Sequence, residues 1–541
     1  MTSRDVRVRA ESASRLLGAG HGAQAAAQAC RALDATPGDP DARRVLARIV
    51  DIARTLLVQD RPVDALALLT PIVDSAHAGG QALMLCGYAL MALHRGEAAE
   101  AALGRWAELE PDNRDATLRL AAVLADNGKD VAAETRVRAE VTRHGDSIDA
   151  AFVLGRALLG QARYAEAEAE FRKVVRGAPG HTLAHANLTE LVWMRTGDAR
   201  AACRELDAAL RAQPRLTGLY ITRARLLLSA QRPREALAAV DAGLAVAPGD
   251  RDLLLAAATT ALDFNADLAL GYAQRLNALV PADAAASVVL GNALLATGDA
   301  PAALEVAQSL RRALPYDGQV IALLADALRA LGDARYRQLL DYQHLVRTGM
   351  IDVPAGWPDR DAYLADLVAA LQQAHTLKAH PVGNSLRGGS QVRLDAPHSA
   401  SLAIRAFPQA IDGPIRRYLQ ALGTGDDPMR ARNTGRYAIS GMWSVRLHAE
   451  GFHTNHYHPA GWIASACYLR LPAAVSQGGE GWLKFGEAAF PTRTPLGPEY
   501  FVRPQPGLLA LFPAYMWHGT VPFSGPADDS RLTIAFDVVP R

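Results

Sequence analysis

The sequence predicts a multidomain protein in which an all-α helical solenoid is followed by a mainly-β double-stranded β-helix, or jelly roll. Two observations lead to this fold class. Prolines recur about every 34 residues in the first part of the chain, and short strand-like segments between glycines and prolines follow near the C-terminus. The length of 541 residues agrees, because one hydrophobic core rarely serves a chain of this size.

The composition is that of a folded protein without charge bias. Half of the residues are hydrophobic and 21% are charged, whereas disordered chains combine low hydrophobicity with high net charge. Lys plus Arg number 57 and Asp plus Glu number 56, which leaves a net charge of +1. This balance gives no support for nucleic acid or an acidic membrane as the main partner.

The cysteines and the N-terminal residues predict the cellular compartment. Four cysteines lie far apart and form no CxxC pair, which argues for a reducing compartment and against a disulfide framework. The first fifteen residues lack the apolar core of a secretory signal. No run of eighteen apolar residues that could span a membrane occurs in the sequence. The cytoplasm is therefore the expected compartment.

The first 340 residues are built from a repeat. Its prolines are Pro111, Pro179, Pro214, Pro248, Pro281 and Pro315. Their intervals are 68, 35, 34, 33 and 34 residues, so the period is 34 with one proline missing near residues 144–146. Each period holds two helix-length apolar patterns and a short turn, such as Ala296–Asp299. A unit this small cannot bury its apolar face alone, so stacked units must share a core.

These units resemble tetratricopeptide repeats. The best match runs from about 148 to 181, with Gly155 and Ala167 where the two helices approach, Phe171 in the second helix and Pro179 at the exit. The resemblance assigns residues 1–350 to the solenoid and implies a protein or peptide partner bound by the repeats. The alternative is that the repeats only dimerise the protein or brace the second domain. The sequence favours no particular oligomeric state.

A helical junction is predicted over residues 351–380, with a turn-rich break at Val353–Pro358. Residues 381–541 are assigned to the jelly roll, since short β-rich segments there are spaced as in a barrel or sandwich. These segments are Trp443–Leu447, Trp462–Leu471, Gly481–Phe485, Gly507–Phe512, Gly519–Phe523 and Leu532–Val539. Eight of the fifteen histidines and five of the seven tryptophans lie beyond residue 350.

Histidines concentrated in this region predict a metal site. His456 and His458 form an HxH pair, and on an extended strand both rings would lie on one face. Neutral imidazole is a general ligand for divalent first-row metals. His518 follows an apolar strand and would complete three ligands. Arg531 begins the last strand, where its guanidinium would bind a carboxylate bidentately; the alternative is a surface ion pair with Asp528 or Asp529.

This constellation resembles the iron(II)/2-oxoglutarate-dependent oxygenases, and among them those fused to tetratricopeptide repeats. The matching stretches are Asn384–Gly389, HTNHYHPAGWI at 453–463, ACYLRLP at 466–472, GWLKFGE at 481–487, PGLLALFPAYMWHGTVPF at 506–523 and RLTIAFDVVP at 531–540. The resemblance implies Fe(II) as metal and 2-oxoglutarate as co-substrate. It makes His456 and His518 iron ligands and places Arg531 on the distal carboxylate of 2-oxoglutarate. Thr533 and Tyr468 become hydrogen-bond partners of the same molecule.

One position departs from the family pattern. The wider family has Asp or Glu two residues after the first histidine, whereas this chain has His458. Iron would then be held by His456, His458 and His518, or His453 or Asn455 would take the vacant place, or the site would be inactive. No catalytic residue beyond the metal ligands is predicted.

The leading prediction is a 2-oxoglutarate-dependent dioxygenase that hydroxylates a protein or peptide recruited by the repeats. The alternatives are a repeat scaffold with an inactive jelly-roll binding domain, and a three-histidine cupin-like metalloenzyme that uses no 2-oxoglutarate. Structural roles are expected for His375, His398 and His448, and Trp462, Trp482 and Trp517 are expected in the barrel core.

Overall fold

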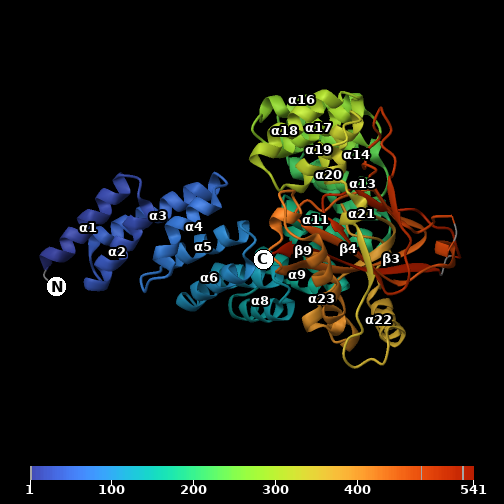
Figure 1. Ribbon diagram of the computed structural model, residues 1–541. Helices are drawn as coiled ribbons and strands as arrows, with labels where there is room; N and C mark the ends of the chain where they lie inside the picture. Colours follow the sequence, from blue (N-terminus) through green and yellow to red (C-terminus); the bar gives the residue numbers. More distant parts are fainter. Residues whose placement is uncertain (1–2, 477, 527–528) are drawn as a thin grey trace. The chain divides into compact units, whose positions relative to one another are not determined.

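The computed structural model describes residues 3–476, 478–526 and 529–541, and it confirms the predicted fold class (Figure 1). Helical repeats are followed by antiparallel β-sheets. The chain divides into two compact units, residues 1–184 (the first unit) and 185–541 (the second unit). The boundaries 1–350, 351–380 and 381–541 drawn from the sequence stay a prediction.

Helical hairpins of the predicted repeat form the first unit. Its helices are α1 (Ser3–Gly18), α2 (Gly22–Ala35), α3 (Pro40–Val58), α4 (Pro62–Val73), α5 (Gly80–Ala92), α6 (Gly96–Leu109), α7 (Arg114–Asp126), α8 (Asp130–His144), α9 (Ile148–Gly160) and α10 (Tyr164–Gly177). Each helix packs on the next one along the chain. Gly155 allows α9 and α10 to approach closely, because a Cβ atom there would lie 2.8 Å from the ring of Phe171.

A buried carboxylate links neighbouring repeats in the first unit. Glu134 of α8 accepts hydrogen bonds of 2.7 Å from Arg138 in its own helix and from Gln161. Arg163 donates to both oxygens of the same carboxylate, also at 2.7 Å. Burial alone raises the pKa of Glu134, but these hydrogen bonds outweigh it and lower the pKa to about 2.

Glu134→Gln is expected to destabilise the first unit by about 1–3 kcal/mol at pH 7, because a charged acceptor of several hydrogen bonds is lost. The folded pKa lies below the unfolded one, so the carboxylate contributes fully above about pH 4.5 and its contribution disappears as the pH falls towards 2. Urea denaturation at pH 7 and pH 3 should show a smaller difference between wild type and variant at pH 3. The matched control is Glu166→Gln, which removes a more exposed partner of Arg163. Equal effects of the two substitutions would contradict the prediction.

The repeat hairpins continue into the second unit. They are α11 (Thr182–Thr196), α12 (Ala199–Ala212), α13 (Thr217–Ser229), α14 (Pro233–Val246), α15 (Arg251–Leu262), α16 (Ala266–Leu279), α17 (Ala284–Thr297), α18 (Ala300–Ala313) and α19 (Gly318–Ala330). The short helices α20 (Tyr336–Leu339) and α21 (Tyr342–Leu345) follow, and α22 (Arg360–Ala374) and α23 (Leu402–Leu422) come later. Among the described helices, none has both the length and the apolar character needed to cross a membrane.

Two antiparallel sheets make up the β-region. The strands are β1 (Arg347–Met350), β2 (Leu386–Arg393), β3 (Tyr437–His453), β4 (Ile463–Arg470), β5 (Leu483–Phe485), β6 (Tyr500–Val502), β7 (Leu508–Pro513), β8 (His518–Thr520) and β9 (Ser530–Pro540). The large sheet has the order β1-β7-β4-β9-β3-β2, and the small sheet has the order β6-β5-β8. The sequence did not predict β1, β2 and β6, which are edge strands with a weak apolar pattern.

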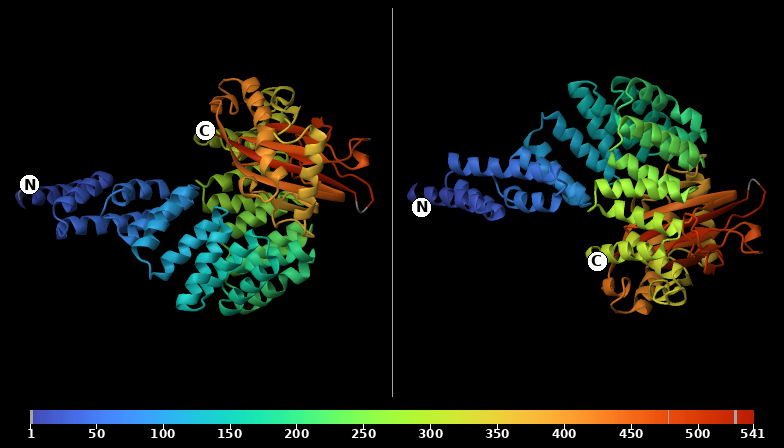
Figure 2. Two further views of the ribbon diagram at one scale, coloured as in Figure 1. Left: turned by 90° about the horizontal axis from the view of Figure 1, so that it is seen from below. Right: turned by 90° about the horizontal axis from the view of Figure 1, so that it is seen from above.

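Helices α22 and α23 cover the large sheet (Figure 2). Tyr363 of α22 and Phe407 of α23 share one buried core with Trp462, Phe512 and other residues of the strands. Figure 2 shows these yellow and orange helices beside the orange and red strands.

The repeats of the second unit also share a core with the β-region. Trp517, expected in the barrel core, is instead buried among residues of the repeat helices together with Phe490. Its indole N–H donates a 2.7 Å hydrogen bond to the carboxylate of Asp326 in α19. The Asp326 side chain is only 2% exposed. Trp482 is half-buried, whereas Trp462 lies in the core as expected.

Candidate functional site

The three candidate metal ligands meet where two segments of the β-region run side by side. The sequence predicts His456 and His458 on a strand, whereas the structure places them just after β3 and outside the named strands. His518 is the first residue of β8. His456 and His518 exchange two backbone N–H···O=C hydrogen bonds of 2.9 Å each. The backbone N–H of His458 donates to Ala514 at 2.8 Å. One ligand nitrogen from each histidine lies within 4.8 Å of the other two.

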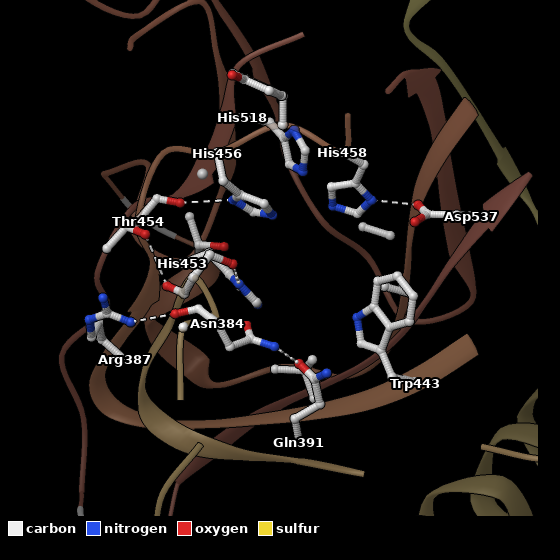
Figure 3. Close-up of a pocket in the computed structure, with 18 of the residues that line it drawn as sticks. Asn384, Arg387, Gln391, Trp443, His453, Thr454, His456, His458, His518 and Asp537 are labelled. Atoms are coloured by element: carbon white, nitrogen blue, oxygen red, sulfur yellow. Dashed lines mark hydrogen bonds and ion pairs between the residues drawn. The ribbon is translucent and has the colours of Figure 1, made fainter. Parts of the chain in front are cut away.

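Hydrogen bonds at Nδ1 orient two of these rings. The Nδ1 atom of His456 lies 2.9 Å from the carbonyl oxygen of Thr454 (Figure 3). That of His518 lies 2.9 Å from the carbonyl oxygen of Met516. A neutral imidazole that donates from Nδ1 keeps the lone pair on Nε2. Both rings are thus fixed in the tautomer that binds a metal through Nε2.

The third ring is oriented by a carboxylate. Nδ1 of His458 lies 2.5 Å from a carboxylate oxygen of Asp537 in β9 (Figure 3). This carboxylate–histidine pair is the usual support of a metal-binding imidazole, since it fixes the ring and strengthens its Nε2 lone pair. No local sequence pattern indicates this role of Asp537, because 79 residues separate it from His458.

Asp537→Ala is expected to weaken metal binding about 10- to 100-fold, as is typical when a partner behind a ligand is lost. Asp537→Asn keeps an acceptor oxygen for Nδ1 of His458, so its metal affinity should fall less than that of Asp537→Ala. The affinity is measured by titrating cobalt(II) against a competing chelator. An exposed aspartate–histidine pair of the same kind, Asp395 with His398 at 2.9 Å, supplies the control Asp395→Ala. Unchanged affinity in Asp537→Ala would remove His458 from the ligand set.

The surroundings lower the pKa values of three histidines of the site, His453, His456 and His518. Burial lowers the pKa of His456 to about 3, and its electrostatic interaction with His458 adds to the shift. Burial, followed by repulsion from His456, lowers the pKa of His518 well below its usual range. The pKa of His453 is lowered in the same way. The lone pairs of these buried rings are therefore not occupied by protons near pH 7.

Arg531 and its neighbours form a buried cationic site. Arg531 is 2% exposed and Thr533 3% exposed, and Tyr468 stands opposite Thr533 in the register of β4 and β9. This burial argues against the surface ion-pair alternative for Arg531; of its two proposed acids, Asp528 lies outside the described residues. The Arg531 guanidinium carbon lies 4.9 Å from the centroid of the Tyr468 ring.

Two polar atoms of this site lack a partner. Arg531 Nε and the Tyr468 hydroxyl are buried and make no hydrogen bond to the described residues. An unpaired buried cation and hydroxyl are unfavourable by themselves. Such a site is suited to an anionic ligand that accepts hydrogen bonds from both groups.

A cavity of about 720 Å³ joins these groups. The histidines 456, 458 and 518, Arg531, Thr533 and Asp537 line it, whereas Tyr468 lies behind Arg531 and is not part of the lining. Figure 3 shows His456, His458 and His518 turned towards one another, with Trp443 and His453 beside them. The volume is that of a typical small-ligand or cofactor pocket.

Part of the cavity wall comes from the repeats. Residues 225, 228 and 229 of α13, residue 259 of α15 and residue 263 just after it line the same space as the metal ligands. The loop Gly383–Ser385 connects the two sides: Gly383 N–H donates to Ser229 at 2.9 Å, and the Ser385 hydroxyl lies 3.0 Å from Nδ1 of His453. No local sequence pattern marks these repeat residues, because the contact exists only in the folded chain.

The other histidines have structural surroundings. His375 is buried between the hydroxyl groups of Ser390 and Ser444, at 2.8 and 3.0 Å. His398 is exposed and paired with an aspartate, and His448 is half-buried. None of the three lines the cavity, in agreement with the roles expected for them.

Sequence comparisons agree with this geometry. Residues 441–537 match the model of the family described as "Putative 2OG-Fe(II) oxygenase". Residues 132–182 and 265–318 match the tetratricopeptide repeat family. All the candidate ligands and Arg531, Thr533, Tyr468 and Asp537 fall within the first match. A comparison with curated proteins gave no match.

Three solved structures overlap parts of the chain. A tetratricopeptide repeat protein from Parabacteroides merdae is 14% identical, with a TM-score of 0.35 over 48% of this chain and 99% of its own. A thermophilic repeat protein from Thermus thermophilus is 20% identical, with a TM-score of 0.26 over 40% and 100%. A Pseudomonas putida prolyl-4-hydroxylase is 16% identical, with a TM-score of 0.26 over 41% and 99%. TM-scores this low carry no argument about the present chain.

Proposed function

We propose that this chain, which joins tetratricopeptide repeats to a domain matching the 2OG-Fe(II) oxygenase family, is an iron(II)- and 2-oxoglutarate-dependent hydroxylase. The observation that carries the proposal is one cavity with two complementary features. Three imidazole nitrogens converge in this cavity, and its wall also contains the buried Arg531, whose Nε has no hydrogen-bond partner among the described residues.

The donor set fits iron(II). Imidazole is a good ligand for divalent first-row metals, and His456, His458 and His518 each keep Nε2 available. His458 stands where the wider family has a carboxylate, and Asp537 supplies a carboxylate behind it. Three histidines, one of them hydrogen-bonded to a carboxylate, favour a site that binds metal. They argue against the alternative of a repeat scaffold with an inactive jelly-roll domain.

The buried cationic site fits 2-oxoglutarate. Arg531 would bind its distal carboxylate through two parallel N–H···O hydrogen bonds. Tyr468 does not line the cavity, so its predicted hydrogen bond to 2-oxoglutarate would require the ligand to reach past the lining residues. Thr533 lines the cavity together with Arg531 and stands opposite Tyr468 in the register of β4 and β9. With iron(II) bound, 2-oxoglutarate and O₂ would be converted to succinate and CO₂, and one oxygen atom would be inserted into a C–H bond of the substrate.

The remaining residues of the cavity protect and orient this chemistry. Phe512 stacks edge-on against His518, with 4.7 Å between the ring centroids. Together with Leu483 it makes one wall of the cavity apolar. An apolar wall excludes water from the bound co-substrate and strengthens its electrostatic contacts with Arg531. The substrate would be a protein or peptide, because helices α13 and α15 of the repeat array line the same cavity.

A three-histidine metalloenzyme without 2-oxoglutarate is the second candidate. The ligand-like geometry of His458 favours it, since cupin-type sites use several histidines. The buried Arg531 has no role in such an enzyme, which is why we rank it second.

The test is an anaerobic titration of the purified full-length protein with iron(II) and then 2-oxoglutarate. The expected result is the weak visible charge-transfer band of an iron–2-oxoglutarate chelate, followed by succinate once oxygen is admitted. Metal binding without a band would favour the second candidate. Absence of both metal binding and a band would overturn the enzyme proposal and leave a repeat scaffold.

A further inference from the structure

The cavity extends beyond the space that iron and 2-oxoglutarate would need. A five-carbon dicarboxylate held by Arg531 would occupy only the inner part of about 720 Å³. The outer wall is formed by the repeats, where Arg225 of α13 and Asp263 at the end of α15 line the cavity. Both side chains are exposed to its interior. Neither side chain forms a direct ion pair with a described residue, although Arg225 is near enough to Glu190 to lower the pKa of that carboxyl against the effect of burial.

Arg225 lies beside the loop that leads to His453. Its guanidinium lies 3.1 Å from the position that a Cβ atom of Gly383 would occupy. The chain then runs from Gly383 to Ser385, whose hydroxyl contacts His453. The ring of His453 stacks on that of His456 at 5.7 Å between centroids. A group bound at Arg225 is therefore only a few contacts from the proposed iron ligand.

Asp263 carries the opposite charge on the same wall. Its closest cationic influence is Arg387, whose Nη1 is already engaged with the carbonyl oxygens of Asn384 and Leu386 at 2.7 and 2.8 Å. The surrounding protein raises the pKa of Asp263 to about 6, and Arg387 opposes the shift. The carboxylate is thus mostly ionised above pH 7 and lacks a direct partner.

We propose that Arg225 and Asp263 determine substrate specificity, and that the substrate is a polypeptide segment carrying an acidic and a basic side chain near the oxidised residue. The acidic side chain would pair with Arg225 and the basic one with Asp263. This inference rests on the proposed oxygenase function. It adds to that function by assigning the choice of substrate to residues of the repeat helices and not to residues of the jelly roll.

A polypeptide satisfies both charges, whereas a small co-substrate does not. The two residues belong to successive repeats, so a ligand must extend across α13 and α15 to reach both. An extended peptide carries charged side chains along its length and has enough reach to place a neighbouring residue at the histidines. The repeat helices contribute one cation and one anion to the wall, so the choice of peptide depends on where its charges stand and not on its net charge.

The test uses full-length protein loaded with iron(II) and 2-oxoglutarate and a randomised library of short synthetic peptides. Peptides that gain one oxygen atom are identified by mass spectrometry. Wild-type products are expected to be enriched in acidic residues on one side of the modified position and basic residues on the other. Arg225→Gln should lose the acidic enrichment, and Asp263→Asn should lose the basic one. Each should lower kcat/KM on the best peptide about tenfold, the effect of one charged hydrogen bond.

The charge-reversed variant Asp263→Lys gives a result that misfolding cannot imitate, because it should replace the basic enrichment by an acidic one. The matched controls are Arg234→Gln and Asp252→Asn, which change exposed charges of α14 and α15 outside the cavity. In all these variants the charge-transfer band should be unchanged.

Two outcomes would overturn the inference. Identical product profiles in wild type, Arg225→Gln and Asp263→Asn would remove the repeat residues from specificity. A charge-transfer band without modification of any peptide would reject the polypeptide substrate and leave the oxygenase proposal intact. Absence of the band itself would instead reject the oxygenase proposal, and this inference with it.

Discussion

Replacing His518 by alanine is expected to abolish metal-dependent turnover while the protein stays folded. Only two imidazole ligands would remain. Binding of iron(II) or cobalt(II) should therefore weaken more than about 100-fold, which exceeds the loss expected when only the hydrogen-bond partner of a ligand is removed, as in Asp537→Ala. The His518 ring is buried against Phe512, so a moderate loss of stability is also expected. Cobalt(II) titration and a succinate assay measure the first effect, and thermal unfolding measures the second.

The control for this experiment is His398→Ala. His398 is an exposed histidine of the same β-region and makes only a surface contact with Asp395. It should leave metal affinity and succinate formation unchanged. If His518→Ala still formed succinate at the wild-type rate, His518 would not be a ligand, and the proposed centre would have to be rebuilt on His453, His456 and His458.

Replacing Arg531 by alanine should separate metal binding from co-substrate binding. The three histidines are untouched, so metal affinity is expected to stay near that of the wild type. The distal carboxylate would lose two charge-assisted hydrogen bonds, each worth about 1.5–3 kcal/mol, so 2-oxoglutarate should bind about 100-fold more weakly or worse. The charge-transfer titration measures this loss directly.

Two further variants keep this result interpretable. Arg531→Lys retains the positive charge but not the planar fork, and it should recover part of the affinity. Arg416→Ala removes an exposed arginine of α23 and should change nothing at the site. Wild-type affinity for 2-oxoglutarate in Arg531→Ala would favour the three-histidine enzyme that uses no 2-oxoglutarate.

The features that sequence reasoning could find are those with a local signal. A proline period of 34 residues predicts stacked helix pairs, and the HxH pair with its distal histidine indicates a metal site. The structure brings His456, His458 and His518 together and buries Arg531 in the same cavity. The roles of Arg531, Thr533 and Tyr468 towards 2-oxoglutarate stay predictions.

The features that sequence reasoning missed depend on contacts between distant segments. Asp537 was visible as a residue of the last strand, but only folding places it behind His458. Arg225 and Asp263 look like ordinary solvent-facing charges of a repeat, and nothing near them in the chain indicates a cavity. Trp517 was assigned to the barrel core because aromatic residues usually fill barrels, whereas its acceptor, Asp326, lies 191 residues away in a repeat helix.

The contact between Trp517 and Asp326 has a consequence for the evolution of this architecture. Once a catalytic segment relies on a neighbouring module for the partner of a buried side chain, the two modules can no longer be exchanged or separated without repair. An excised jelly roll would expose Trp517 and Phe490 to water and leave the indole N–H without its acceptor. Substitutions at these positions must therefore be inherited together with their repeat. In this chain the second-unit repeats and the β-region therefore form one structural unit and not two interchangeable modules.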